Sequence, residues 1–182
     1  MLRRTFRSLR HPNFRLFFAG QLLSLVGTWM QNVAQLWLVY RLTGSGMDLG
    51  VAGFMNHFPV VLLAPWGGML ADRVDRRRLL LLTQTVAMLQ AALLAALTLS
   101  GHVQVWHVYL LAGVLGLSQG VDIPARQSFI IEMVGREDLP NAIALNSSMF
   151  NAARLLGPAG AGLLVALSGE GICFLINAVS FL

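Results

Sequence analysis

The sequence contains no lysine, a single cysteine and few charged residues of either sign. Charged residues make up 12% of the 182 residues, compared with about 25% in soluble domains. The lone Cys173 cannot form an internal disulfide, so the cysteine content does not indicate a redox compartment. Motifs for a phosphate-binding loop, a zinc site or a nucleotide fold are also missing, so we expect no cofactor and no ATP-driven pump.

Apolar residues dominate the chain. Hydrophobic residues make up 56% of it, and the mean hydropathy is +0.67 with a pI near 11.0. A basic chain raises nucleic-acid binding as a possibility, but here the 13 arginines stand in short clusters between apolar runs. This pattern is typical of a membrane surface, so we expect a lipid bilayer and no nucleic acid as partner.

Uncharged runs long enough to cross a bilayer recur along the sequence. The first two, 16–40 and 49–71, have 25 and 23 residues, and a spanning helix needs about 20. The run 79–121 has 43 residues, enough for two helices, with a plausible turn at 100–104. We expect an all-α integral membrane protein with helices at about 16–40, 49–71, 79–99, 105–121, 142–167 and 172–182.

The two ends of the sequence lead to two further expectations. The last apolar run is too short to span a bilayer, so we interpret the sequence as a fragment that ends within a truncated sixth helix. The basic stretch before the first helix is typical of a signal peptide, but the apolar run that follows is too long for one. We therefore expect a basic cytoplasmic arm at 1–15 and a transmembrane bundle at 16–182.

Arginines alternate between the two sides of the expected bundle. The arm and the even-numbered connections hold 11 of them, whereas the odd-numbered connections hold only Arg41. By the positive-inside rule the arm and the even connections are cytoplasmic. We expect a multi-pass protein of the plasma membrane, the bacterial inner membrane, with a cytoplasmic N-terminus.

The connection between the second and third helices reads "GMLADRVDRRRLL". It resembles the signature of the major facilitator superfamily at this place, Gly-x-Leu-Ala-Asp-Arg-x-Gly-Arg-Arg. The matching residues are Gly68, Leu70, Ala71, Asp72, Arg73, Arg76 and Arg77. The second glycine of the signature is replaced by Asp75, a residue that tolerates a left-handed backbone better than most.

The resemblance implies a gate at the cytoplasmic face. In it, the aspartate and arginine of the motif pair with an acidic residue at the inner end of the fourth helix, and Asp122 stands in that place. Asp72 and Arg76 are four residues apart and share a face if the turn is helical. The alternative is that these charges are solvated and contribute under about 1 kcal/mol per pair.

The fifth helix reads "NAARLLGPAGAGLL", which is similar to the antiporter signature of the drug exporters in the same superfamily. The match rests on Gly157, Pro158 and Gly162, with alanines at two other positions. Tight helix packing is an equally good interpretation of these small residues. Together with "DIPARQSFIIEMV", the sequence is most similar to the branch that includes the enterobactin exporter and the transmembrane secretion effectors.

This resemblance implies the fold and the function. The fold is the six-helix N-terminal half of a 12-helix transporter, built from two inverted three-helix repeats. The function is secondary transport, with export of a small amphipathic molecule such as a drug or siderophore by proton antiport. The partners are a small-molecule substrate, protons and the missing C-terminal half. Another exporter signature fits poorly, because Gly116 stands where the fourth helix of many exporters has arginine.

Polar residues inside the expected helices predict a path for the substrate. They recur at spacings of three and four along the first helix and along the fifth, so each set lies on one stripe. The candidates are Gln21, Thr28, Gln31, Asn32, Gln35, Asn56, His57, Ser147, Asn151 and Arg154. Arg154 lies near the middle of its helix, where an arginine costs at least about 2.5 kcal/mol, so we expect it to face the cavity; the alternative is a buried structural ion pair that only holds two helices together.

Two other classes of protein compete with a transporter. The string "GLSQG" at 116–120 satisfies the Gly-x-Ser-x-Gly pattern of serine hydrolases. That mechanism needs a strand, a strained turn and a helix around the serine, whereas the string lies in an expected transmembrane helix. A helical membrane protein without transport activity fits the helices but not the gate motif.

Overall fold

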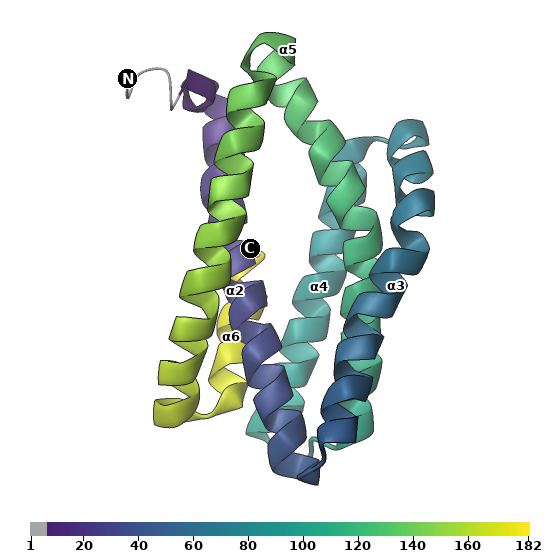
Figure 1. Ribbon diagram of the computed structural model, residues 1–182, viewed down its shortest axis with the longest axis vertical. Coiled ribbons are helices and arrows are strands. Elements are labelled where there is room, and N and C mark those ends of the chain that lie inside the picture. Colours follow the sequence, from purple (N-terminus) through teal and green to yellow (C-terminus); the bar gives the residue numbers. More distant parts are fainter. Residues whose placement is uncertain (1–6) are drawn as a thin grey trace.

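The computed structural model describes residues 7–182, and these residues are almost entirely helical (Figure 1). Arg3 and Arg4 of the expected basic arm lie outside the described residues. The elements are η1 (Arg7–Arg10), α2 (Pro12–Thr43), α3 (Gly46–Arg73), α4 (Arg76–Leu99), α5 (Val105–Ser168) and α6 (Glu170–Ser180). Helix α2 therefore begins within the expected arm, four residues before position 16.

In the described residues the expected fourth and fifth helices follow each other directly and belong to one element, α5. Gly135 interrupts it with a φ of 70° and a ψ of 176°, and the chain reverses there (Figure 1). We call residues 105–134 the first arm of α5 and residues 136–168 the second arm. The expected connection at 122–141 is thus largely helical, since its charged residues pair with one another or lie at the end of the bundle.

Local sequence explains where the helices begin and end. Pro12 stands in the first turn of α2, where its missing N–H costs nothing. Gly44 ends that helix in the left-handed conformation, with a φ of 64°. Asp75, at the position of the signature's second glycine, has a φ of −55° and accepts a hydrogen bond from the Arg78 N–H. The turn therefore does not need a left-handed residue, and Asp75 acts as the N-cap of α4.

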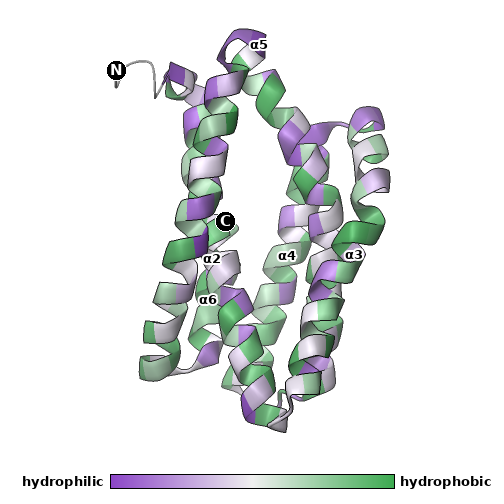
Figure 2. Ribbon diagram, in the orientation of Figure 1, coloured by the Kyte–Doolittle hydropathy of each residue, from purple (hydrophilic) through white to green (hydrophobic). Residues whose placement is uncertain are grey.

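The connections lie at two opposite ends of the bundle. Element η1, the α3–α4 connection and the turn of α5 share one end, and the other connections share the opposite end (Figure 1). Hydrophilic residues gather at the turn of α5 and at the α3–α4 connection (Figure 2). The arginine-rich segments 73–78 and 126–136 are thus at the same end, as the alternation of arginines predicts.

Three of the described helices are long and apolar enough to cross a membrane: α3, α4 and α5. Helix α2 has 32 residues but is not among them, because its polar stripe lowers its hydropathy. The core nevertheless includes α2, whose Ala34 and Leu38 pack with Leu94 of α4 and Phe174 of α6. Polar side chains along α2 are therefore held inside a helical bundle.

Candidate functional site

A cavity of about 640 Å³ lies among α2, α3, α4 and both arms of α5. Its lining combines polar side chains with Trp29 and Phe150, whose rings meet edge to face at 5.7 Å. The polar lining residues are Gln21, Ser24, Thr28, Asn32, Gln35, Asn56, His57, Thr83, Gln84, Ser118, Gln119, Asp122, Arg126, Gln127 and Asn146. Six of the ten residues proposed from the sequence are in this set: Gln21, Thr28, Asn32, Gln35, Asn56 and His57.

Gln31 does not line the cavity, although it belongs to the same stripe of α2. It is fully buried and accepts a hydrogen bond from Asn177 Nδ2 at 2.7 Å. Its own Nε2 donates to Gln90 Oε1 at 3.0 Å. The three carboxamides form a ladder that joins α6, α2 and α4, so the expectation that Gln31 faces a substrate path is wrong.

The stripe on the second arm of α5 also lies outside the cavity lining. Ser147, Asn151 and Arg154 are all exposed, and Asn151 Nδ2 donates to the Ser147 carbonyl at 2.9 Å. The Arg154 guanidinium lies over the Trp29 ring, 5.8 Å from its centroid. The expectation that Arg154 faces the cavity is wrong, because its guanidinium lies on the outer side of Trp29, an aromatic residue that itself lines the cavity.

Asp122 and Arg126 are the ion pair of the cavity. Both line it, and their side chains are 6% and 16% exposed. Arg126 Nη2 contacts Asp122 Oδ2, one helical turn away. Asp122 Oδ1 accepts hydrogen bonds from Thr83 Oγ1 at 2.8 Å and Gln84 Nε2 at 3.1 Å. Arg126 was not among the residues singled out in the sequence, although its spacing of four from Asp122 indicates such a pair.

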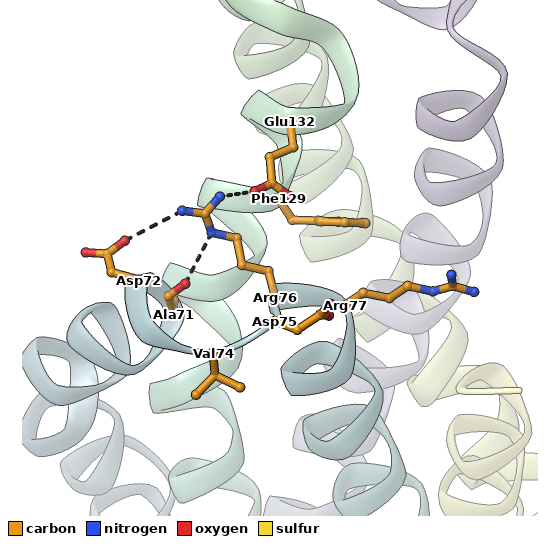
Figure 3. A pocket seen from close by; sticks show the side chains of 8 residues that line it. All are labelled: Ala71, Asp72, Val74, Asp75, Arg76, Arg77, Phe129 and Glu132. Carbon is orange, nitrogen blue, oxygen red and sulfur yellow. Dashed lines mark hydrogen bonds and ion pairs between the residues drawn. The ribbon is translucent and has the colours of Figure 1, made fainter.

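The gate motif forms a second cluster, at the end of the bundle where α3 and α4 connect (Figure 3). Arg76 Nε donates to the Ala71 carbonyl at 3.2 Å, and Nη2 lies 3.7 Å from Asp72 Oδ1. Arg76 Nη1 contacts Glu132 on the first arm of α5. The arginine therefore bridges three elements of the bundle.

The expected partner of this cluster is different from the observed one. Among the described residues, the acid of α5 that contacts Arg76 is Glu132, and Asp122 pairs instead with Arg126. The reason is the length of the first arm, which continues beyond Asp122 and brings Glu132 level with the connection. Arg77 points away from Arg76 in Figure 3. Arg73 is exposed, and Gly68 is half-buried.

The small residues of the second arm differ from one another in their surroundings. A Cβ on Gly157 would lie 2.4 Å from the Trp29 Cβ, so α2 and α5 touch there. Gly162 has no such neighbour within 4 Å, and Pro158 lines the cavity. Close helix packing thus accounts for Gly157 but not for Gly162.

The hydrolase string has no catalytic surroundings. Ser118 lies in the first arm of α5, and its Oγ donates to the Thr83 carbonyl at 2.8 Å. Ser118 lies within a continuous helix, and the strand and sharp turn that expose a nucleophilic serine are not present beside it in the described residues. The hydroxyl group joins two helices.

Comparison with known proteins agrees with this geometry. The family model described as "Transmembrane secretion effector" matches residues 3–182. The Staphyloferrin A transporter of Staphylococcus aureus is 28% identical over 166 residues, which is 91% of this chain and 42% of that protein. The Multidrug efflux pump Tap of Mycolicibacterium fortuitum is 28% identical over 165 residues, 88% of this chain and 40% of that protein.

A further relative is the Enterobactin exporter EntS of Shigella boydii, 26% identical over 159 residues. These cover 87% of this chain and 38% of that protein, so the chain spans about two fifths of the length of these relatives. The resemblance inferred from the two motifs is confirmed, and the hydrolase alternative is wrong. The chain belongs to the transmembrane secretion effector family of the major facilitator superfamily, whose members are transporters and not enzymes.

Proposed function

We propose that the chain forms the N-terminal half of a secondary transporter that exports a small amphipathic molecule by proton antiport. The observation that supports this best is the 640 Å³ cavity, whose mainly apolar lining also contains polar and aromatic side chains. Relatives named as a siderophore transporter, an efflux pump and an enterobactin exporter support a substrate of this kind. Two inverted repeats, the bilayer of the bacterial inner membrane and a complementary C-terminal half are parts of the same proposal.

Asp122 is the residue that we propose for the proton. It is the acidic residue among those that line the cavity, and the other titratable groups there are Arg126 and His57. His57 Nδ1 lies 3.0 Å from the Gly53 carbonyl of its own helix. A proton on Asp122 would neutralise the carboxylate and leave Arg126 charged without its partner, which is costly at a buried site. Proton uptake would therefore change which conformation of the cavity is stable.

The function can be tested on the full-length transporter in proteoliposomes with an acidic interior and a clamped membrane potential. We expect rhodamine 6G, a fluorescent amphipathic cation, to accumulate inside as protons leave. A protonophore should abolish the accumulation, and protein-free liposomes are the control. Accumulation that is independent of the pH gradient would contradict proton antiport.

We propose that the end of the bundle with the α3–α4 connection is cytoplasmic, and that the contact between Arg76 and Glu132 closes this end. Arginine-rich segments gather there, as in cytoplasmic connections generally. The guanidinium joins the α3–α4 connection to α5 through Ala71, Asp72 and Glu132. A contact that bridges separate helices holds them together only in the conformation in which they meet.

One labelling experiment tests the orientation and the gate together. A cysteine at Val74, which is 42% exposed, should react with a membrane-impermeant maleimide only from the cytoplasmic side, and one at Gly101 only from outside. Adding Glu132→Gln should raise the labelling rate at position 74 several-fold, because Arg76 loses its anchor on α5. Reversed sidedness would overturn the orientation, and an unchanged rate would reduce the Arg76 contact to a surface ion pair.

A further inference from the structure

One wall of the cavity contains carboxamides without partners. Trp29, Asn32 and Gln35 follow one another at intervals of three along α2, and all three line the cavity. Asn32 Oδ1 and Gln35 Oε1 are buried atoms that accept no hydrogen bond within the part of the chain that the structure describes. Gln35 is only 3% exposed as a whole residue. Buried acceptors normally have a donor, so these two need one from outside the bundle.

The neighbouring carboxamides show that the fold can pair such groups where they serve packing. Gln31 lies four residues before Gln35 on the same helix and is joined to Asn177 and Gln90 in the ladder described above. Gln84 donates to Asp122. Asn32 and Gln35 thus differ from Gln31 in having unpaired oxygens at the cavity wall, although Gln90 Nε2 of the ladder is also buried without a partner in the described structure.

The two unpaired oxygens of Asn32 and Gln35 need hydrogen-bond donors and not further acceptors. Asp122 and Arg126, the charged groups that line the cavity, pair with each other, and Arg126 Nε is buried without a hydrogen-bond partner among the described residues. A carboxylate oxygen placed against Asn32 Oδ1 or Gln35 Oε1 would set lone pairs against lone pairs, whereas an N–H or O–H group would satisfy these two oxygens. One turn away, Trp29 and Phe150 offer flat apolar surfaces.

We propose that Asn32 and Gln35 form a subsite that accepts hydrogen bonds from N–H or O–H groups of the transported molecule, whose flat apolar part lies against Trp29 and Phe150. The subsite rests on the proposed transport function and defines its substrate class. Substrates are amphipathic molecules with donor groups beside an aromatic or similarly flat body. Binding of a donor also fits antiport, since it does not draw Arg126 away from a deprotonated Asp122.

Two fluorescent probes distinguish binding that depends on donor groups from binding that depends only on amphipathic character. Rhodamine 6G has an N–H on each amine, whereas rhodamine B ethyl ester has a xanthene core of the same charge with fully alkylated nitrogens. Their dissociation constants can be measured by fluorescence anisotropy on the purified full-length transporter. We expect rhodamine 6G to bind about five- to tenfold more tightly, the difference that one or two hydrogen bonds make.

Two variants test whether the subsite causes the preference for rhodamine 6G over rhodamine B ethyl ester. Gln35→Met keeps the length of the side chain but removes the acceptor. The ratio of the two dissociation constants should therefore fall towards one, because only rhodamine 6G binds more weakly. Asn151→Leu is the control, because Asn151 is a carboxamide outside the cavity lining whose Nδ2 donates to the Ser147 carbonyl of its own helix. It should leave the preference unchanged. Equal affinities in the wild type, no binding of either probe, or an unchanged preference in Gln35→Met would overturn the proposal.

Thermal unfolding separates a binding role from a structural one. Gln35→Met should unfold at the wild-type temperature or higher, because an unpaired buried group is lost. Gln31→Met should unfold at a lower temperature, because it breaks the ladder. A Gln35→Met protein that is less stable than the wild type would show that its amide is structural. If the subsite fails in these tests while pH-driven transport persists, the proposed function still stands. If the subsite passes these tests while transport does not depend on pH, the subsite stands and proton antiport is overturned.

Discussion

Replacing Asp122 by asparagine should abolish pH-driven accumulation of rhodamine 6G by the full-length transporter in proteoliposomes. Asparagine has nearly the same shape but cannot exchange a proton near neutral pH. Exchange of probe across the membrane without a gradient should persist, because the cavity remains. The substitution also leaves Arg126 buried without its partner, which typically costs about 3–5 kcal/mol. The thermal unfolding temperature should therefore fall as well.

A double variant separates the loss of coupling from the loss of stability. Asp122→Asn with Arg126→Gln removes both charges, so no unpaired ion is left and much of the stability should return. Transport by this variant should still be insensitive to the pH gradient. If it showed the pH dependence of the wild type, Asp122 would not be the proton site.

Gly116→Ala should greatly reduce the amount of folded transporter. A Cβ at this position would lie 2.3 Å from the Asn56 carbonyl oxygen and 3.1 Å from its carbon. Both are backbone atoms of α3, so no side chain can move aside. Overpacking of this kind costs typically about 1–3 kcal/mol, and here the helices themselves must separate. The thermal unfolding temperature and the yield of full-length protein in detergent measure the effect.

Gly113→Ala is the matched control on the same face of the first arm of α5. The nearest atom to its Cβ would be the Met55 carbonyl oxygen at 4.0 Å, an open distance. Alanine also favours the helix over glycine by about 0.5–1 kcal/mol, so this variant should be as stable as the wild type or more so. Equal stability of the two alanine variants would contradict the close approach of α3 and α5.

The sequence alone was sufficient for much of the helical framework. Uncharged runs, bounded by Asp48, Asp72, Arg78 and the turn at 100–104, place α3 and α4 within three residues of their observed ends. The family could be recognised from the motif at 68–77, because the residues that form this turn are consecutive in the sequence. The spacing of polar residues on α2 likewise indicated a cavity wall, since helical periodicity depends only on neighbours along the chain.

The partners of the polar groups depended on the tertiary structure. Gln31 and Gln35 lie on the same stripe, yet packing of α4 and α6 covers the first with Gln90 and Asn177 and leaves the second facing the cavity. Asp122 and Glu132 are both acids of the first arm of α5, and the length of this arm beyond Asp122 decides that Glu132 is the one that reaches Arg76. Periodicity assigns a residue to a face of its helix. What meets that face is determined by how the helices cross, which depends on contacts between residues far apart in the sequence.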